Sequence, residues 1–199
     1  MRSRLAVLLS LLILTCWTGL ASGRKAKKPA QPKNPVVEIA TSMGMIQIEL
    51  FPDKAPKTVE SFIKYVKAGH YAGTIFHRVI DNFMVQGGGF DARYEKKPTR
   101  ASINNEADNG LTNDRGTVAM ARTPNPHSAA AQFFVNVKNN DFLNHQSKTL
   151  EGWGYCVFGK VVKGMDVMDQ IKKVPTGAKG PFSKDAPLKE VLIKKARVL

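Results

Sequence analysis

The amino-acid sequence predicts a mainly β fold, either an antiparallel barrel or a sandwich, with two helices covering its open ends. Its 199 residues suit one domain of ordinary size with additional segments, and 43% of them are hydrophobic, which is enough for a packed core. Sixteen glycines and eleven prolines indicate many tight turns. About eight short strand-like runs and only two helical segments occur without a β–α–β rhythm, so a parallel sheet is not expected.

Residues 1–23 have the three-part layout of a secretory signal peptide. A basic start with Arg2 and Arg4 precedes a nearly continuous apolar run over residues 5–20, and small residues follow where a signal peptidase would cut. The run is short for a stable membrane span. We therefore expect a periplasmic protein that meets the membrane only through this segment. Secretion, an uncleaved N-terminal anchor and lipidation at Cys16 are the alternatives, although the residues before Cys16 fit a lipidation signal poorly.

Residues 24–35 (RKAKKPAQPKNP) read as a flexible basic linker, because lysine and proline dominate and almost nothing can be buried. Five of the thirty basic residues lie in this run, and the formal net charge of the chain is +14. Such a charge would suit a nucleic acid as partner. The remaining basic residues are scattered, and neither a zinc-finger spacing nor an arginine-rich helix occurs. We therefore favour a basic enzyme surface and expect no specific nucleic acid.

The folded domain is expected to cover residues 36–199. Two apolar-rich runs, 36–40 and 46–50, are separated by the short segment 41–44, which predicts a β-hairpin. Four apolar residues then recur at helical spacing before a terminating Gly69, which predicts an amphipathic helix of about three turns. These four are Val59, Phe62, Ile63 and Val66.

The rest of the domain is predicted to consist of strands and one further helix. Short runs rich in β-branched or aromatic residues predict strands. A second short helix is expected over residues 165–173, ended by Val174-Pro175. The predicted strands cover residues 74–80, 83–86, 117–122, 132–137, 155–162 and 188–199.

Several catalytic chemistries have no anchor in this sequence. The four histidines, at positions 70, 77, 127 and 145, are too far apart for a helical metal pair, and no acid is placed to complete a site. Neither a G-x-S-x-G elbow nor a Gly-Lys-Ser/Thr phosphate loop occurs. Cys156 lies in an apolar run and reads as a packed core residue rather than a nucleophile. We expect no metal and no cofactor.

The predicted strand over residues 132–137 has two different faces. Because side chains alternate across a strand, Gln132 and Phe134 share one face. Phe133, Val135 and Val137 share the other face. One face can fill the core while the other lines a cleft.

Two neighbouring strands add candidates for the same cleft. Met84 and Gln86 share a face, and alternation places Arg78 on the face of Phe76 and Ile80. An arginine is seldom buried unless it is paired. Arg78 therefore requires either an acidic partner or a ligand, and the pattern alone leaves both open.

Four motifs are unusual together: Phe76-His77-Arg78-Val79-Ile80, Asn82-Phe83-Met84-Val85-Gln86-Gly87-Gly88, Ala119-Met120-Ala121-Arg122 and Ala131-Gln132-Phe133-Phe134-Val135. In this order and at these separations they resemble the cyclophilin family of peptidyl-prolyl isomerases. The resemblance extends from about residue 36 to the C-terminus. It implies a closed eight-stranded antiparallel β-barrel capped by two α-helices.

The resemblance implies an enzyme that accelerates cis–trans isomerisation of X-Pro bonds and so assists the folding of exported proteins. It implies that Arg78 is the catalytic donor to the twisted prolyl amide. It also implies proline-containing polypeptides as partners, no cofactor and a monomer. The expected substrate-binding residues are Phe83, Met84, Gln86, Ala121, Arg122, Gln132, Phe134, Phe142, Leu143 and Tyr155.

Three positions depart from the family pattern. Many cyclophilins carry a tryptophan before a leucine at the edge of the cleft, where this chain has Phe142-Leu143 followed by an inserted segment to Glu151. Loss of the indole N–H removes one donor, so inhibitors of the cyclosporin type are expected to bind more weakly while catalysis is retained. Arg122 stands where an asparagine is common, and Tyr155 where a histidine is common. Both are expected to change substrate preference.

Two other functions stay open at this point. A cyclophilin-like binding module would hold proline-containing segments without turnover, but the intact set of Arg78, Phe83, Gln86 and Phe134 argues against lost activity. A structural or nucleic-acid-associated protein would use the basic surface and would give a salt-dependent gel shift. The client proteins cannot be named from the sequence.

Overall fold

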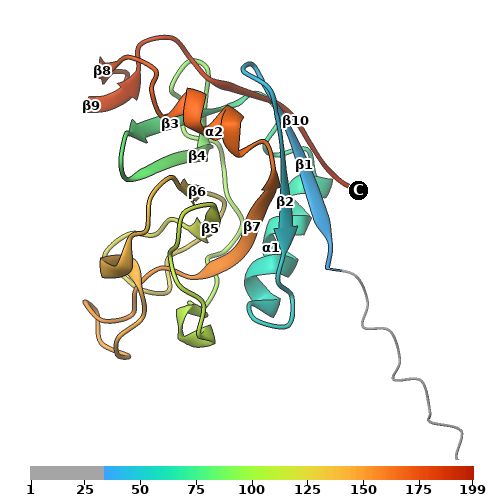
Figure 1. Ribbon diagram of the computed structural model, residues 1–199, viewed down its shortest axis with the longest axis vertical. Helices are drawn as coiled ribbons and strands as arrows, with labels where there is room; N and C mark the ends of the chain where they lie inside the picture. The colour runs from blue at the N-terminus through green and yellow to red at the C-terminus, as the bar shows by residue number, and fades with distance from the viewer. Residues whose placement is uncertain (1–33) are drawn as a thin grey trace, which may run out of the picture. The chain divides into compact units, whose positions relative to one another are not determined.

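The computed structural model describes residues 34–199; the predicted signal peptide and nearly all of the predicted linker lie outside them. Eight strands close into an antiparallel barrel in the order β1-β10-β3-β4-β6-β5-β7-β2 (Figure 1). The barrel is the one that the family resemblance implies, and the sandwich is excluded. The strands are β1 Val36–Thr41, β2 Met45–Leu50, β3 Thr74–Ile80, β4 Met84–Asp91, β5 Thr117–Met120, β6 Phe133–Asn136, β7 Val157–Lys163 and β10 Leu192–Val198.

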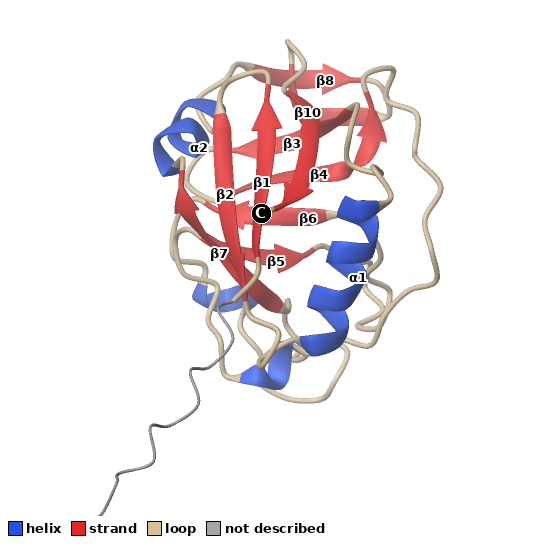
Figure 2. Ribbon diagram, turned by 90° about the vertical axis from the view of Figure 1, so that its right-hand side faces the viewer, coloured by secondary structure: helices blue, strands red, loops and turns tan. Residues whose placement is uncertain are grey.

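Two helices cover the open ends of the barrel, α1 (Pro56–Lys67) and α2 (Met165–Ile171), as predicted (Figure 2). Pro56 suits the first turn of α1, where a missing N–H costs no hydrogen bond. The buried side of α1 includes Val59, Phe62 and Val66, whose spacing predicted this helix. Among residues 34–199, no helix is long and apolar enough to cross a membrane.

A second, two-stranded sheet is not predicted by the sequence pattern. It consists of β8 (Thr176–Lys179) and β9 (Phe182–Pro187), which pair with each other and not with the barrel strands. The side chains of β8 are exposed or half-buried, so this strand lacks the apolar alternation that marks a strand in a sequence. The strand predicted over residues 188–199 accordingly begins later, at Leu192.

The barrel strands have two differently used faces. Their inner faces enclose one continuous core, which includes Phe133 and Val135. A smaller cluster, here called the outer cluster, lies on the opposite face and consists of Met84, Ala119, Phe134, Leu143 and Val157. The alternation predicted for residues 132–137 is therefore confirmed.

A β-bulge in β3 corrects the face predicted for Arg78. The pairing with β4 joins Phe76 to Gly87 and then Arg78 to Gln86, so β3 advances by two residues while β4 advances by one. As a result, Phe76 and Val79 both belong to the barrel core. Arg78 is half-buried and turned away from that core. The predicted shared face of Phe76 and Arg78 is wrong, and the bulge explains how an apolar strand carries a cation.

Candidate active site

Three members of the outer cluster, Met84, Phe134 and Leu143, form the floor of a hollow of about 110 Å³, here called the apolar hollow. Strands β3, β4 and β6 contribute to its walls, together with the segment that follows β5 and the short 3-10 turn Asp141–Leu143. It unites nine of the eleven predicted site residues. These are Arg78, Phe83, Met84, Gln86, Ala121, Arg122, Phe134, Leu143 and Tyr155.

The other two predicted residues, Gln132 and Phe142, lie beside the apolar hollow. Gln132 lines a neighbouring hollow and accepts a hydrogen bond at 2.9 Å from the amide of Gln86. Phe142 is 70% exposed, and its ring stacks on Phe83 with centroids 5.5 Å apart. Phe142 therefore extends the apolar wall outward into solvent.

The charge of Arg78 is only loosely paired. Its Nε lies 4.0 Å from Oδ2 of Asp185 in β9, which is too long for a hydrogen bond. The side chain of Arg78 is 40% exposed. The sequence left open whether Arg78 meets an acid or a ligand, and the geometry shows a distant acid with the guanidinium still accessible. Asp185 was missed because it belongs to the hairpin that the sequence pattern does not reveal.

His77, next to Arg78, is buried beneath the β8–β9 hairpin. Its ring packs against Phe90 and Phe182, with centroids 4.7 and 5.2 Å away. Its Nδ1 has no hydrogen-bond partner among the described residues. Burial lowers the pKa of His77 to about 4. At neutral pH the imidazole is therefore uncharged, and Arg78 is the cation that β3 presents to the hollow.

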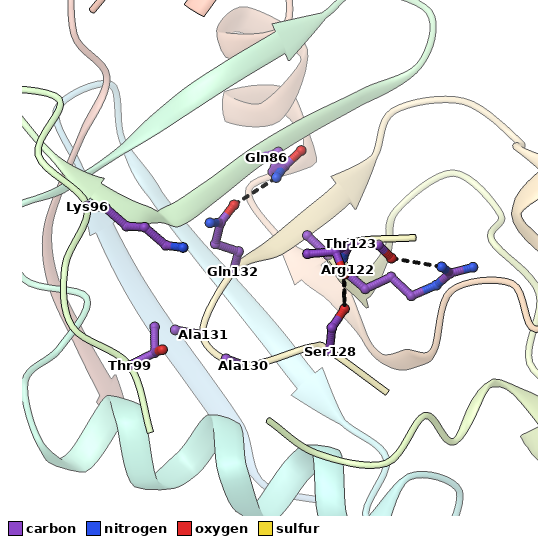
Figure 3. A pocket seen from close by; sticks show the side chains of 10 residues that line it. Gln86, Lys96, Thr99, Arg122, Thr123, Ser128, Ala130, Ala131 and Gln132 are labelled. Atoms are coloured by element: carbon purple, nitrogen blue, oxygen red, sulfur yellow. Dashed lines mark hydrogen bonds between the residues drawn. The ribbon is translucent and has the colours of Figure 1, made fainter. Parts of the chain in front are cut away.

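A second hollow of about 290 Å³ adjoins the first and is here called the polar hollow, because most of its lining residues have polar side chains. Figure 3 shows the hydrogen bond between Gln86 and Gln132 on its wall. Gly89 permits this arrangement, because a Cβ there would lie 2.5 Å from the Gln132 side chain. Six residues of this hollow are not among the predicted site residues, and all six lie outside the named strands. They are Lys96, Thr99, Thr123, Ser128, Ala130 and Ala131.

The two departures from the family pattern at positions 122 and 155 form one structural unit. The guanidinium carbon of Arg122 lies 4.6 Å from the centre of the Tyr155 ring. Its Nε donates to the carbonyl of Gly154 at 3.0 Å, and Nη1 donates to the carbonyls of Thr123 and Pro124 at 3.0 and 3.2 Å. Arg122 is thus held across the rim of the apolar hollow.

Metal and thiol chemistry have no geometric support in the described part of the chain. Within residues 34–199, no three histidine, cysteine, aspartate or glutamate side chains converge as metal ligands would. Cys156 is 3% exposed in the barrel core, and burial raises the pKa of its thiol to about 11. The interpretation of Cys156 as a packed core residue is confirmed.

This arrangement suits a flat apolar group attached to a peptide. The floor of the hollow is apolar, and its polar side chains, Arg78, Gln86 and Arg122, are all capable of donating hydrogen bonds. Among the described residues, no carboxylate lines the hollow. Such a site can hold an amide and place a positive charge beside it without a nucleophile.

Residues 36–198 match the family model described as "Cyclophilin type peptidyl-prolyl cis-trans isomerase/CLD". The peptidyl-prolyl cis-trans isomerase cyp18 of Streptomyces antibioticus is 60% identical over 163 residues, 82% of this chain and 98% of the relative. Peptidyl-prolyl cis-trans isomerase B of Escherichia coli (strain K12) is 55% identical over 163 residues, 82% of this chain and 99% of the relative.

Solved structures agree with these sequence matches. A cyclophilin type peptidyl-prolyl cis-trans isomerase of Cryptosporidium parvum is 27% identical, with a TM-score of 0.67 over 83% of this chain and 98% of that one. A crystal structure of the same protein in the presence of the dipeptide Ala-Pro is 28% identical, with a TM-score of 0.66 over 82% and 98%. The chain belongs to the cyclophilin-type peptidyl-prolyl cis-trans isomerase family and is a peptidyl-prolyl cis-trans isomerase.

Proposed function

We propose that this isomerase acts on X-Pro bonds in the apolar hollow, with Arg78 as the catalytic donor. The observation that carries the proposal is an accessible guanidinium, displaced from the core by a bulge, in the wall of an apolar hollow. The crystal structure of the Cryptosporidium protein in the presence of Ala-Pro supports proline-containing peptides as ligands.

The reaction requires stabilisation of a twisted amide and no bond cleavage. Partial double-bond character imposes a barrier of ~18–20 kcal/mol on rotation about the peptide bond. Shortening an event of ~10 s to ~1 ms needs about 5–6 kcal/mol of transition-state stabilisation. In the twisted amide the nitrogen regains its lone pair, and a fixed positive charge beside that lone pair stabilises the transition state more than the planar ground state.

The remaining side chains bind and orient the substrate. The apolar floor excludes water from one side of the prolyl ring, which strengthens the interaction of Arg78 with the amide. Gln86 binds the flanking backbone, while Ala121, Arg122, Gln132 and Tyr155 contact neighbouring residues of the peptide. The ring is held by Phe83, Met84, Phe134 and Leu143, with Phe142 extending this wall.

Replacement of Arg78 by alanine tests the proposal. We expect kcat/KM for a short proline-containing peptide to fall by roughly 10²–10³-fold, as when a preorganised charge donor is removed. Arg93→Ala is the matched control, because the Arg93 side chain is 76% exposed and lines none of the hollows described. Near-normal activity in a folded Arg78→Ala protein would refute the catalytic role.

The same variants separate catalysis from simple binding. A module that only holds proline-containing segments would bind an unfolded client without accelerating its proline-limited refolding phase. We expect the wild-type protein to accelerate that phase and Arg78→Ala to bind the client without doing so.

We also propose that the enzyme assists the folding of exported proteins in the periplasm and works as a monomer. The basic start, apolar run and small residues within positions 1–23 support export. Mass spectrometry of the N-terminus from separated cell fractions tests this. A protein that begins near residue 24 in the periplasmic fraction is expected, whereas an intact residue 1 in the cytoplasm would contradict it.

A further inference from the structure

A broad open groove adjoins the apolar hollow at the turn Asp141–Leu143. Its volume is about 1090 Å³, and it shares Arg122, Leu143 and Tyr155 with the hollow. We call this groove the shelf. Because three residues line both sites, a chain leaving the hollow on this side enters the shelf directly.

The shelf carries unusually exposed apolar side chains. Phe142 is 70% exposed and Leu150 is 66% exposed, more than any other exposed large hydrophobic residue of the described chain. Single exposed apolar residues are common on protein surfaces, whereas apolar residues gathered along a groove beside a binding cleft point to a ligand. Leu150 comes from the segment that is inserted relative to the family pattern, between Leu143 and Glu151.

The inserted segment is held in a defined conformation, which keeps Leu150 exposed. The backbone N–H groups of Gln146 and Ser147 both donate to the carbonyl of Gly152, at 2.8 and 3.1 Å. The N–H of Trp153 donates to the carbonyl of Thr149 at 3.1 Å. The loop is thus closed on either side of Leu150.

Side chains support the same loop from beneath. The Trp153 ring packs against His127 and His145, with centroids 5.0 and 5.3 Å away. Lys148 lies 5.7 Å from the centre of the Trp153 ring and pairs with Asp108 at 2.8 Å. A loop ordered in this way loses little conformational freedom when a ligand binds, so its apolar surface is available for binding.

We infer that the shelf binds a bulky apolar side chain of the same polypeptide whose proline occupies the apolar hollow. The inference rests on the proposed function and names a preferred substrate class. An extended chain advances at most about 3.5 Å per residue, so a side chain two or three positions from the proline reaches a groove that begins at the rim of the hollow. Its contact with Leu150 and Phe142 removes apolar surface from water on both partners.

Three peptides test the inference with the purified protein. The first is a short alanine peptide with one central proline, and the other two carry a phenylalanine two residues before or two residues after that proline. In one of the two phenylalanine peptides the phenylalanine side chain reaches the shelf. We expect kcat/KM for that peptide to be several-fold above the value for the short peptide. Leu150→Ser is expected to abolish this gain and leave the short peptide unchanged.

Matched variants control for stability and for general surface effects. Leu199→Ser removes a leucine that is 59% exposed at the C-terminus and is expected to keep the gain. Leu150→Met preserves apolar bulk and is also expected to keep it. Thermal unfolding of each variant verifies that it is folded.

Several outcomes would overturn the inference. If the wild-type protein isomerises the short peptide but neither phenylalanine raises kcat/KM, this inference fails while the proposed function stands. Equal losses of activity on all three peptides in Leu150→Ser would have the same consequence. A dimer in sedimentation that Leu150→Ser dissociates would assign the shelf to a second copy of the chain instead. If the wild-type protein does not isomerise the short peptide, the proposed function fails, and this inference fails with it.

Discussion

Phe133 and Phe134 are neighbours in β6 with nearly equal burial, 0% and 4% exposed, yet they belong to different parts of the molecule. Phe133 packs in the barrel core, with ring centroids 5.6 Å from Phe62 and 5.5 Å from Tyr71. Phe134 lies in the floor of the apolar hollow, edge-on to Tyr155 at 5.7 Å. Burial alone therefore does not distinguish an aromatic residue of the core from one that lines the proposed site; the cluster to which the residue belongs does.

The largest effect is expected on the core side. Phe133→Ala should lower the free energy of unfolding by about 3–5 kcal/mol, because the surrounding core cannot collapse to fill the cavity. Urea denaturation of the variant measures this loss. A loss below about 1 kcal/mol would mean that the inner face is loosely packed, and the contrast with Phe134 would disappear.

His77 extends the comparison to a polar group buried among aromatic rings. Its folded-state pKa of about 4 lies below the unfolded value of about 6.5, so protonation favours the unfolded chain. The contribution of His77 to the free energy of unfolding is therefore fully present above pH 6.5 and is lost as the pH falls toward 4. The loss from this residue is at most about 3 kcal/mol. Between pH 7 and pH 4, the free energy of unfolding measured by denaturation should change less with pH for His77→Gln than for the wild type. An equal pH dependence in the two proteins would show that the pKa of His77 is not lowered by folding.

A smaller stability effect and a clear activity effect are expected at Phe134. In Phe134→Ala, water can enter the space from the hollow, so we expect a loss of about 2 kcal/mol in the free energy of unfolding, less than for Phe133→Ala. The prolyl ring loses part of its floor, and kcat/KM should fall at least roughly tenfold. Activity assays and urea denaturation of both variants compare the two faces. A stable, fully active Phe134→Ala protein would remove Phe134 from the site.

The alternation of apolar residues explains why the sequence predicts both faces of β6 correctly. A period of two residues assigns Phe133 and Phe134 to opposite sides whenever the strand is regular. The same rule fails at Arg78, because the bulge adds one residue to β3 and reverses the faces beyond it. A bulge is set by the pairing of two strands, and a single strand sequence does not reveal it.

Other parts of the site depend on contacts between distant segments. The roles of Arg78 and of the aromatic floor follow from the family resemblance. Nine of the eleven site residues that it implies line one hollow. Asp185 approaches Arg78 from a hairpin whose residues are mostly exposed or half-buried. Lys96 and Thr99 reach the polar hollow from an irregular segment between β4 and β5. Neither segment has a hydrophobic period, so these positions become visible only in the folded chain.

The smallest effect is expected at the rim, where Tyr155 supports Arg122. Tyr155→Leu removes the aromatic face beneath the guanidinium, which is worth about 0.5–1 kcal/mol at a partly exposed site. The three carbonyls that accept from Arg122 remain, so the guanidinium should stay near the rim. We expect a two- to fivefold change in the ratio of kcat/KM values for peptides with an acidic or a neutral residue beside the proline.

Tyr155→Phe is the matched control, because it keeps the ring face and removes only the hydroxyl group. If stacking on the ring holds Arg122, this variant should retain the wild-type ratio, while Tyr155→Leu changes it. Equal changes in both variants would assign the effect to the hydroxyl group instead. Retention of the ratio in Tyr155→Phe would distinguish the rim from the floor, because we propose that Phe134 supports the prolyl ring itself and that Tyr155 acts on neighbouring residues by holding a second cation in place.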